Sequence, residues 1–200
     1  MPILGIMASQ ISGHLFAPSG AYDSIATTTL STSTATITFS SIPATYTHLQ
    51  IRYLAKTNRA TYGVDDGFIT LNSDVTGANY YSHFLYGDGS SATASQSAGN
   101  GGGGQGIFWP FVFSTTQISP VGFAGGVIDV LDYANTNKYK TLRCLAGFDA
   151  NGGTAGGYGG QVIFASGAWF STAAANNITI KANGSFQQYS QFALYGIKGA

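Results

Sequence analysis

Charged residues are scarce in this 200-residue sequence. They make up 8% of it, against the roughly 25% usual in soluble domains, and glutamate does not occur at all. Because glutamate and lysine are strong helix formers, their shortage disfavours helices. The formal net charge is zero and no basic stripe is present, which argues against nucleic acid as a partner.

Further absences narrow the class of protein. The one cysteine, Cys144, allows no internal disulfide, and its place in an alternating apolar run predicts a buried thiol. No run of about 18 apolar residues occurs, so we expect no transmembrane helix and no membrane insertion. No basic region precedes the apolar residues of the N-terminus, so we expect no secretory signal.

The sequence is rich instead in strand-forming residues separated by turns. Residues 126–151 are the clearest case, because two apolar runs flank a polar turn at residues 134–137 that contains two asparagines. Residues 141–148 alternate, with one face made of Leu142, Cys144, Ala146 and Phe148. About ten or eleven short strands of this kind predict an all-β fold, a jelly-roll-like antiparallel β-sandwich with long glycine-rich loops.

We expect a single sandwich domain over residues 21–200, preceded by an attachment arm over residues 1–20. The first sixteen residues carry no formal charge, and their apolar side chains would be costly to leave in water. A partner surface is therefore the expected destination of Ile3, Leu4, Ile6, Met7, Ile11, Leu15 and Phe16. The alternative is a frayed terminus, since chain ends are often disordered.

The glycine-rich segments 87–106 and 152–160 are predicted to be loops, the first of them about twenty residues long. Pro110 follows in an aromatic run and cannot donate a ladder hydrogen bond, which places that strand at a sheet edge. Aromatic residues bracket the first loop and could contact a protein partner or a glycan, core packing being the alternative: Tyr80, Tyr81, Tyr86, Trp109 and Phe111.

Residues able to carry chemistry show no recognised spacing. His48 and His83 flank strands and could approach each other in space, but no zinc-binding motif supports a metal role. Four aspartates could ligate calcium, although turn-forming roles are favoured because the EF-hand spacing is missing: Asp65, Asp66, Asp74 and Asp88. We therefore predict no enzyme and no catalytic, cofactor or metal site. A polysaccharide-cleaving aspartate pair is the minor alternative, because it needs only spatial proximity.

Several stretches resemble a family of small virion proteins of tailed bacteriophages, especially marine ones. They are AYDSIA at 21–26, ITFSSIPATYTHLQIR at 37–52, NSDVTGANYYSHFLYGDGSS at 72–91, VIDVLDYANTNKYKT at 127–141 and FALYGIKG at 192–199. The resemblance implies a structural component of the virion, exposed on the capsid or tail as a decoration, fibre or tail protein. Other virion proteins would then be its partners.

Two further expectations concern partners. The low charge and a last strand that is apolar on both faces predict self-association, most simply as a homotrimer. The alternative to a purely structural role is a receptor- or carbohydrate-binding module at a fibre tip, with a host surface glycan as its ligand.

Overall fold

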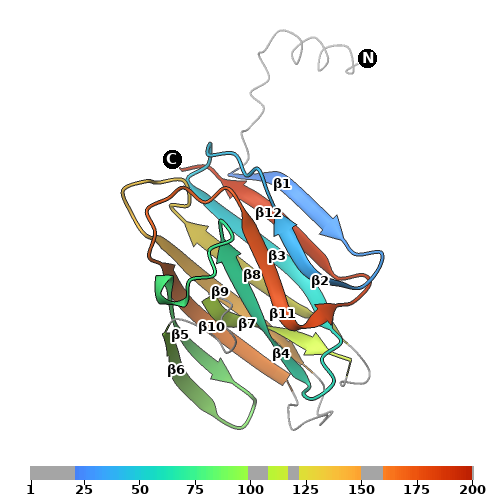
Figure 1. The fold of residues 1–200 in the computed structure, drawn as a ribbon. Coiled ribbons are helices and arrows are strands. Elements are labelled where there is room, and N and C mark those ends of the chain that lie inside the picture. The colour runs from blue at the N-terminus through green and yellow to red at the C-terminus, as the bar shows by residue number, and fades with distance from the viewer. Residues whose placement is uncertain (1–20, 99–107, 117–121, 150–159, 200) are drawn as a thin grey trace, which may run out of the picture.

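The computed structural model describes residues 21–98, 108–116, 122–149 and 160–199 (Figure 1). These residues form strands, with one short 3₁₀ turn, Gly77–Asn79, ahead of β5. No helix in the described part is long and apolar enough to cross a membrane. The strands are β1 (Tyr22–Thr29), β2 (Thr34–Phe39), β3 (His48–Thr57), β4 (Val64–Leu71), β5 (Tyr80–Gly87), β6 (Ala92–Ala98), β7 (Phe108–Thr115), β8 (Ala124–Leu131), β9 (Lys140–Asp149), β10 (Gly160–Trp169), β11 (Ile178–Phe186) and β12 (Gln191–Ile197).

Antiparallel pairings nest inside one another along the chain. β5 pairs with β6, β4 with β7, β3 with β8, β2 with β11 and β1 with β12. Such nesting arises when one long hairpin folds over on itself, which is how a jelly roll is built. The predicted all-β sandwich is therefore confirmed.

The strands form two layers that share β3. A wide sheet has the order β1-β12-β3-β8-β9-β10-β5-β6, and a narrow sheet has the order β2-β11-β4-β7. The end of β3 pairs with β7 in parallel and with β11, which joins the two sheets. The edge position predicted from Pro110 holds only for the start of β7, because β3 pairs with its end, Ser114 and Thr115. The register of β7 against β4 shifts near Pro110.

One hairpin departs from the nested order. β9 and β10 pair with each other and insert between β8 and β5, which widens one sheet by two strands. The predicted strand, turn and strand over residues 126–151 are confirmed as β8, the 132–139 turn and β9. Asn135 stabilises this turn, because its side-chain oxygen accepts a 2.8 Å hydrogen bond from the Asn137 amide.

The core lies between the two sheets. Ile51, Ile128 and Cys144 from the wide sheet and Ile69 and Ile180 from the narrow sheet are almost wholly buried. Burial raises the pKa of the Cys144 thiol, so this cysteine stays protonated and inert at neutral pH. The inward alternation predicted for residues 141–148 is confirmed for Leu142, Cys144 and Ala146.

Part of the first glycine-rich segment forms a strand. Residues 92–98 do not belong to a long loop, because they form β6 and pair with β5 from Gly87↔Ala92 to Tyr81↔Ala98. Their small polar side chains hide this strand from pattern analysis, since backbone hydrogen bonds to β5 hold it and not side-chain burial. Residues 99–107 and 150–159 lie outside the described residues, and so does the predicted arm, residues 1–20.

Candidate functional site: the outer face of the wide sheet

The outer face is the side of the wide sheet turned away from the narrow sheet. Because side chains alternate along a strand, the neighbours of the buried residues Cys144, Ile163 and Ala165 point to this face. Large apolar side chains gather there and are between 48% and 57% exposed: Leu54, Leu85, Leu145, Val162 and Phe164. In an antiparallel sheet with one solvated face, polar residues are expected at these positions.

Cross-strand pairing lines these side chains up in two rows. In the apolar row, Leu145 of β9 is paired with Val127 on one side and with Phe164 on the other, and Phe164 is paired with Leu85. In the next row, named the glycine row, Val162 lies between Gly147 and Gly87 and Leu54 lies opposite Gly125. Glycines therefore leave no side chain between the projecting Leu54 and Val162.

A polar row borders the apolar row on its other side. It runs across the same strands through Gln50, Asp129, Arg143, Ser166 and His83. Asp129 accepts hydrogen bonds from Gln50 Nε2 at 2.9 Å and from Arg143 at 3.1 Å. Gln50 also accepts a 2.7 Å bond from Arg52 Nε, so these side chains hold one another in place.

Arg52 lies at the β3 end of the apolar row, opposite Val127, and its bond to Gln50 links that row to the polar row. Its guanidinium lies over the rings of Tyr22 and Tyr195, 5.3 Å and 5.1 Å from their centroids. Cation–π contacts of this kind fix both the cation and the rings. The outer face is thus preorganised, with a hydrogen-bonded border beside an apolar centre.

The chemistry of this face suits contact with a protein surface. Five half-exposed apolar side chains leave apolar surface on the order of 400 Å², comparable to the largest patch on a typical monomer, which is often functional. Four of the five are branched aliphatic side chains, which offer no flat ring on which a sugar could stack.

Sequence reasoning placed partner contacts elsewhere, around the first glycine-rich segment. The prediction is wrong for Tyr80, which is 1% exposed and packs on Trp169 with ring centroids 6.5 Å apart. Its hydroxyl accepts a hydrogen bond from the Leu71 amide and donates one to the Asp74 carbonyl. Burial also raises the pKa of Tyr80, so its hydroxyl stays protonated.

The other predicted contact residues are divided between faces. Tyr81 lies on the outer face, with its hydroxyl 2.9 Å from the Gln96 carbonyl oxygen and its ring 5.1 Å from His83. Tyr86 is partly buried and packs against the core. Trp109 and Phe111 belong to β7, but their side chains lie outside the described part.

Sequence analysis does not single out the exposed apolar side chains of β9 and β10, because no local pattern separates an exposed apolar residue from a buried one. A signal was present in the sequence: residues 162–165, VIFA, are apolar at every position, although only one face of a sandwich strand is needed for the core. Leu145 is a second such signal, because it is apolar although it alternates with the inward residues Cys144 and Ala146.

The predicted metal candidates are not brought together. No group of three or more potential metal ligands occurs among the described residues. His48 on β3 and His83 on β5 are separated by β8, β9 and β10, about 19 Å at ordinary strand spacing, so they do not come together. Asp88 instead accepts hydrogen bonds from the Ser90 and Ser91 amides, which lower its pKa to about 2.

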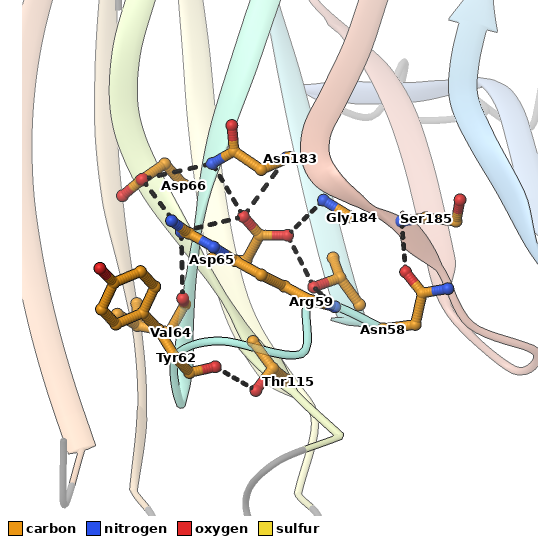
Figure 2. Close-up of polar contacts among 11 residues, drawn as sticks. Asn58, Arg59, Tyr62, Val64, Asp65, Asp66, Thr115, Asn183, Gly184 and Ser185 are labelled. Atoms are coloured by element: carbon orange, nitrogen blue, oxygen red, sulfur yellow. Dashed lines mark hydrogen bonds and ion pairs between the residues drawn. The ribbon is translucent and has the colours of Figure 1, made fainter. Parts of the chain in front are cut away.

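Asp65 is the centre of a buried network at one end of the sandwich (Figure 2). Its carboxylate is fully buried and accepts 2.7 Å and 2.8 Å hydrogen bonds from the Thr57 hydroxyl and the Gly184 amide. Asn183 donates from its side chain at 3.0 Å, and Arg59 completes an ion pair at 3.4 Å. A shift in the register between β11 and β2 at residues 181–186 accompanies this use of β11 amides.

The Arg59 guanidinium lies between the carboxylates of Asp65 and Asp66, where a metal ion would otherwise bind. Its Nη1 atom is 3.4 Å from Asp65 Oδ1 and 3.3 Å from Asp66 Oδ2. Its guanidinium also lies 4.6 Å from the centroid of the Tyr62 ring. A side chain at Gly184 would approach the Arg59 amide to 2.7 Å, so only glycine fits there. We interpret this network as structural, fastening the 58–63 turn to β11 and not holding calcium.

Asp74 has a similar fastening role. It accepts hydrogen bonds from Trp169 Nε1 at 2.7 Å, Asn79 Nδ2 at 2.8 Å and the Thr76 amide at 2.9 Å. Partial burial raises the pKa of Asp74, but the three hydrogen bonds outweigh that effect and lower it overall. The ionised form is therefore favoured by the folded state.

This lowered pKa predicts an acid-dependent contribution to stability. A carboxyl whose pKa is depressed by folding stabilises above its unfolded pKa, near 3.9, and loses that contribution as the pH falls through the folded value. We expect Asp74→Asn to be less stable than wild type at pH 7, with the difference shrinking below about pH 4. Urea unfolding at pH 7, 5, 4 and 3 measures it, and a difference independent of pH would contradict the assignment.

Comparison with known proteins adds little beyond this geometry. No family model and no curated protein matches the chain. The binding domain of botulinum neurotoxin DC in complex with SialylT shares 9% identity over 84% of this chain and 38% of its own, with a TM-score of 0.32. SCP-B, a member of the eqolisin family of peptidases, shares 7% over 84% and 65%, with a TM-score of 0.26.

A third structure, the CBM2 module of Lactobacillus casei BL23 phage J-1 evolved Dit, shares 12% identity over 87% of this chain and 77% of its own, with a TM-score of 0.24. The chain spans less than two thirds of the toxin and SCP-B chains. The similar structures thus include binding modules, a phage module and peptidases. At TM-scores this low, the likenesses carry no argument about function.

Proposed function

We propose that this chain is a non-enzymatic structural protein of a tailed-bacteriophage virion, exposed on the capsid or tail, that works by binding other protein surfaces. The observation that carries the proposal is the apolar centre of the outer face, formed by Leu54, Leu85, Leu145, Val162 and Phe164. It is a surface for contact and offers no acid, base or nucleophile at its centre.

This apolar centre is not needed to hold the fold together. β9 and β10 already bury Leu142, Cys144, Ala146, Ile163 and Ala165 on their inner side. Burying a side chain such as leucine or phenylalanine contributes about 1.5–3 kcal/mol, so leaving five such side chains half exposed forgoes considerable stabilisation in the isolated chain. A partner surface recovers it.

The virion assignment draws on the segments that resemble phage structural proteins. Residues 37–52 include the start of β3, residues 127–141 include most of β8, and residues 192–199 include most of β12. These three strands are direct neighbours in the wide sheet, in the order β12-β3-β8. Three of the five resembling segments therefore contribute adjacent strands to the sheet that carries the outer face, and a fourth, residues 72–91, contributes β5 of the same sheet.

Particle incorporation tests the proposal. A phage lacking the gene is complemented with wild type, with Phe164→Lys or with the control Val75→Lys, which changes a side chain of matched exposure (54%) in the turn after β4. We expect wild type and Val75→Lys in purified particles at a fixed copy number, and at least about tenfold less Phe164→Lys, because a buried charge weakens such a contact strongly. Absence of the wild-type protein from purified particles would refute the assignment.

A glycan-binding role is the second candidate, and Tyr81 favours it. Tyr81, His83 and Gln96 form an aromatic and polar group on the β5–β6 side of the outer face, beside the β5 end of its apolar centre. A glycan array probed with the purified protein tests this role. Binding that Tyr81→Ala abolishes and Phe164→Lys leaves intact would favour the glycan, and an array without any signal would dismiss it.

A further inference from the structure

We propose that the outer face binds the same face of a second copy of this chain, forming a two-fold dimer centred on the β9–β10 hairpin. The inference rests on the proposed function only in taking the outer face to be a contact surface. The size of the face, the arrangement of its projecting side chains and its charges all favour a second copy of this chain as the partner.

The size of the face suits a stable dimer. β3, β8, β9, β10, β5 and β6 lie side by side. The polar, apolar and glycine rows cover them, together with a fourth row beyond the polar row that runs through Thr141, Ala168 and Tyr81. At ordinary strand spacing and rise, that area is on the order of 700 Å². Stable interfaces bury about 800 Å² on each partner, so one such face supplies most of what a dimer needs.

The projecting side chains of the face match the positions without side chains on the same face of a second copy. A two-fold axis that runs parallel to the strands between β9 and β10 sets β9 of one copy over β10 of the other, and β8 over β5. It places Leu145 over Phe164 of the second copy in the apolar row. In the glycine row it places Val162 over Gly147 of the second copy, so a projecting side chain meets a position that has none.

The same axis also places complementary side chains of the two polar rows opposite each other. Asp129 on β8 and His83 on β5 lie equally far from the axis, one strand beyond β9 and β10, so each faces the other across the interface. Arg143 faces Ser166 of the second copy. No two like charges meet in this row, and sheets that pack face to face keep their strands within about 30° of each other, which preserves these oppositions near the axis.

This arrangement favours a dimer over the trimer expected from the sequence. A closed ring of three subunits needs two different surfaces on each subunit, whereas a face that binds its own copy closes after two. The outer face is a single surface with a self-complementary centre.

Two charge substitutions test the pairing by sedimentation. Leu145→Lys and Phe164→Asp each place an unpaired charge in the centre of the interface, so each alone should weaken dimerisation at least about 30-fold. Mixed in equal amounts, the two variants should form a heterodimer, because the lysine introduced into one chain then faces the aspartate introduced into the other while the second contact stays native. Val75→Lys is the control and should dimerise like wild type.

Three results would overturn the proposal. The first is a wild-type protein that sediments at 20.7 kDa at a concentration on the order of 100 µM, which is far above the Kd of a stable dimer. The others are single variants that still dimerise and a mixture of the two variants that stays monomeric. Because both residues are solvent-exposed in the single chain, the thermal melts of the variants should match that of wild type at concentrations where all are monomeric. Failure here is separable from failure of the proposed function: a monomeric wild type that still requires Phe164 for incorporation refutes the dimer alone. If the wild type dimerises and the variants behave as expected, but the protein is absent from particles, only the virion assignment is refuted.

Discussion

Replacing Asp65 by alanine is expected to lower the free energy of unfolding by about 3–5 kcal/mol, the cost typical of breaking a buried ion pair on one side. The carboxylate is fully buried and accepts hydrogen bonds from Thr57, Asn183 and Gly184 while it pairs with Arg59. Its removal leaves the Thr57, Asn183 and Gly184 donors without this acceptor and leaves Arg59 with only the partly exposed Asp66 as its ion-pair partner. For a domain of this size the melting temperature should fall by roughly 10 °C.

Asp66→Ala is the matched control for this experiment. Asp66 is adjacent in the chain and pairs with the same guanidinium at 3.3 Å, but its side chain is 30% exposed and water can replace the contact. We expect its loss to cost no more than about 1 kcal/mol. Equal effects of the two substitutions in urea unfolding would show that burial of Asp65 is not what gives the network its strength.

Replacing Phe113 by alanine should destabilise the protein by a similar amount, about 3–5 kcal/mol. Its ring lies 5.0 Å from those of Tyr53 and Phe186 and 6.4 Å from that of Phe192, measured between centroids. These residues come from β7, β3, β11 and β12, so the cluster ties the two sheets together where β3 joins them. Alanine would leave a cavity in the middle of this contact.

Phe170→Ala provides the comparison for Phe113→Ala. Phe170 is 43% exposed and makes an edge-to-face contact with Tyr139 at 5.6 Å, on the surface after β10. We expect this loss to be smaller, about 1–1.5 kcal/mol, because 43% of the side chain stays in contact with water in the folded protein. If Phe113→Ala unfolded at the same denaturant concentration as Phe170→Ala, the aromatic cluster would not be the inter-sheet core described above.

Much of the fold could be predicted from strand periodicity alone. Leu142 and Cys144 alternate with Thr141 and Arg143, and a turn with two asparagines precedes them, so β8 and β9 follow from local rules. β6 could not be predicted, because its small residues, among them Ser95 and Ser97, carry no burial pattern. Its existence depends on backbone pairing with β5, which is a tertiary property.

The candidate site was harder to predict than the fold. Leu145, Phe164 and Leu85 are far apart in the sequence and become neighbours only because β9 and β10 insert between β8 and β5. Strand periodicity predicts that an apolar residue is buried, but it does not show how many apolar side chains the core between the sheets can hold. Tyr80 shows the converse error, since an aromatic residue beside a glycine-rich segment turned out to be core.

Side-chain footprinting of the assembled particle tests the central claim, that the outer face is the contact surface of this protein. Hydroxyl radicals label exposed leucine, phenylalanine and tyrosine side chains, and labelling is compared between dilute free protein and purified particles. We predict that Leu85, Leu145 and Phe164 are labelled in the free protein and at least about fivefold less in particles, as expected for the desolvated centre of an interface. Tyr189, 66% exposed in the turn before β12, should be labelled equally in both and serves as the reference. Equal labelling of Leu145 and Phe164 in free and assembled protein would contradict the account.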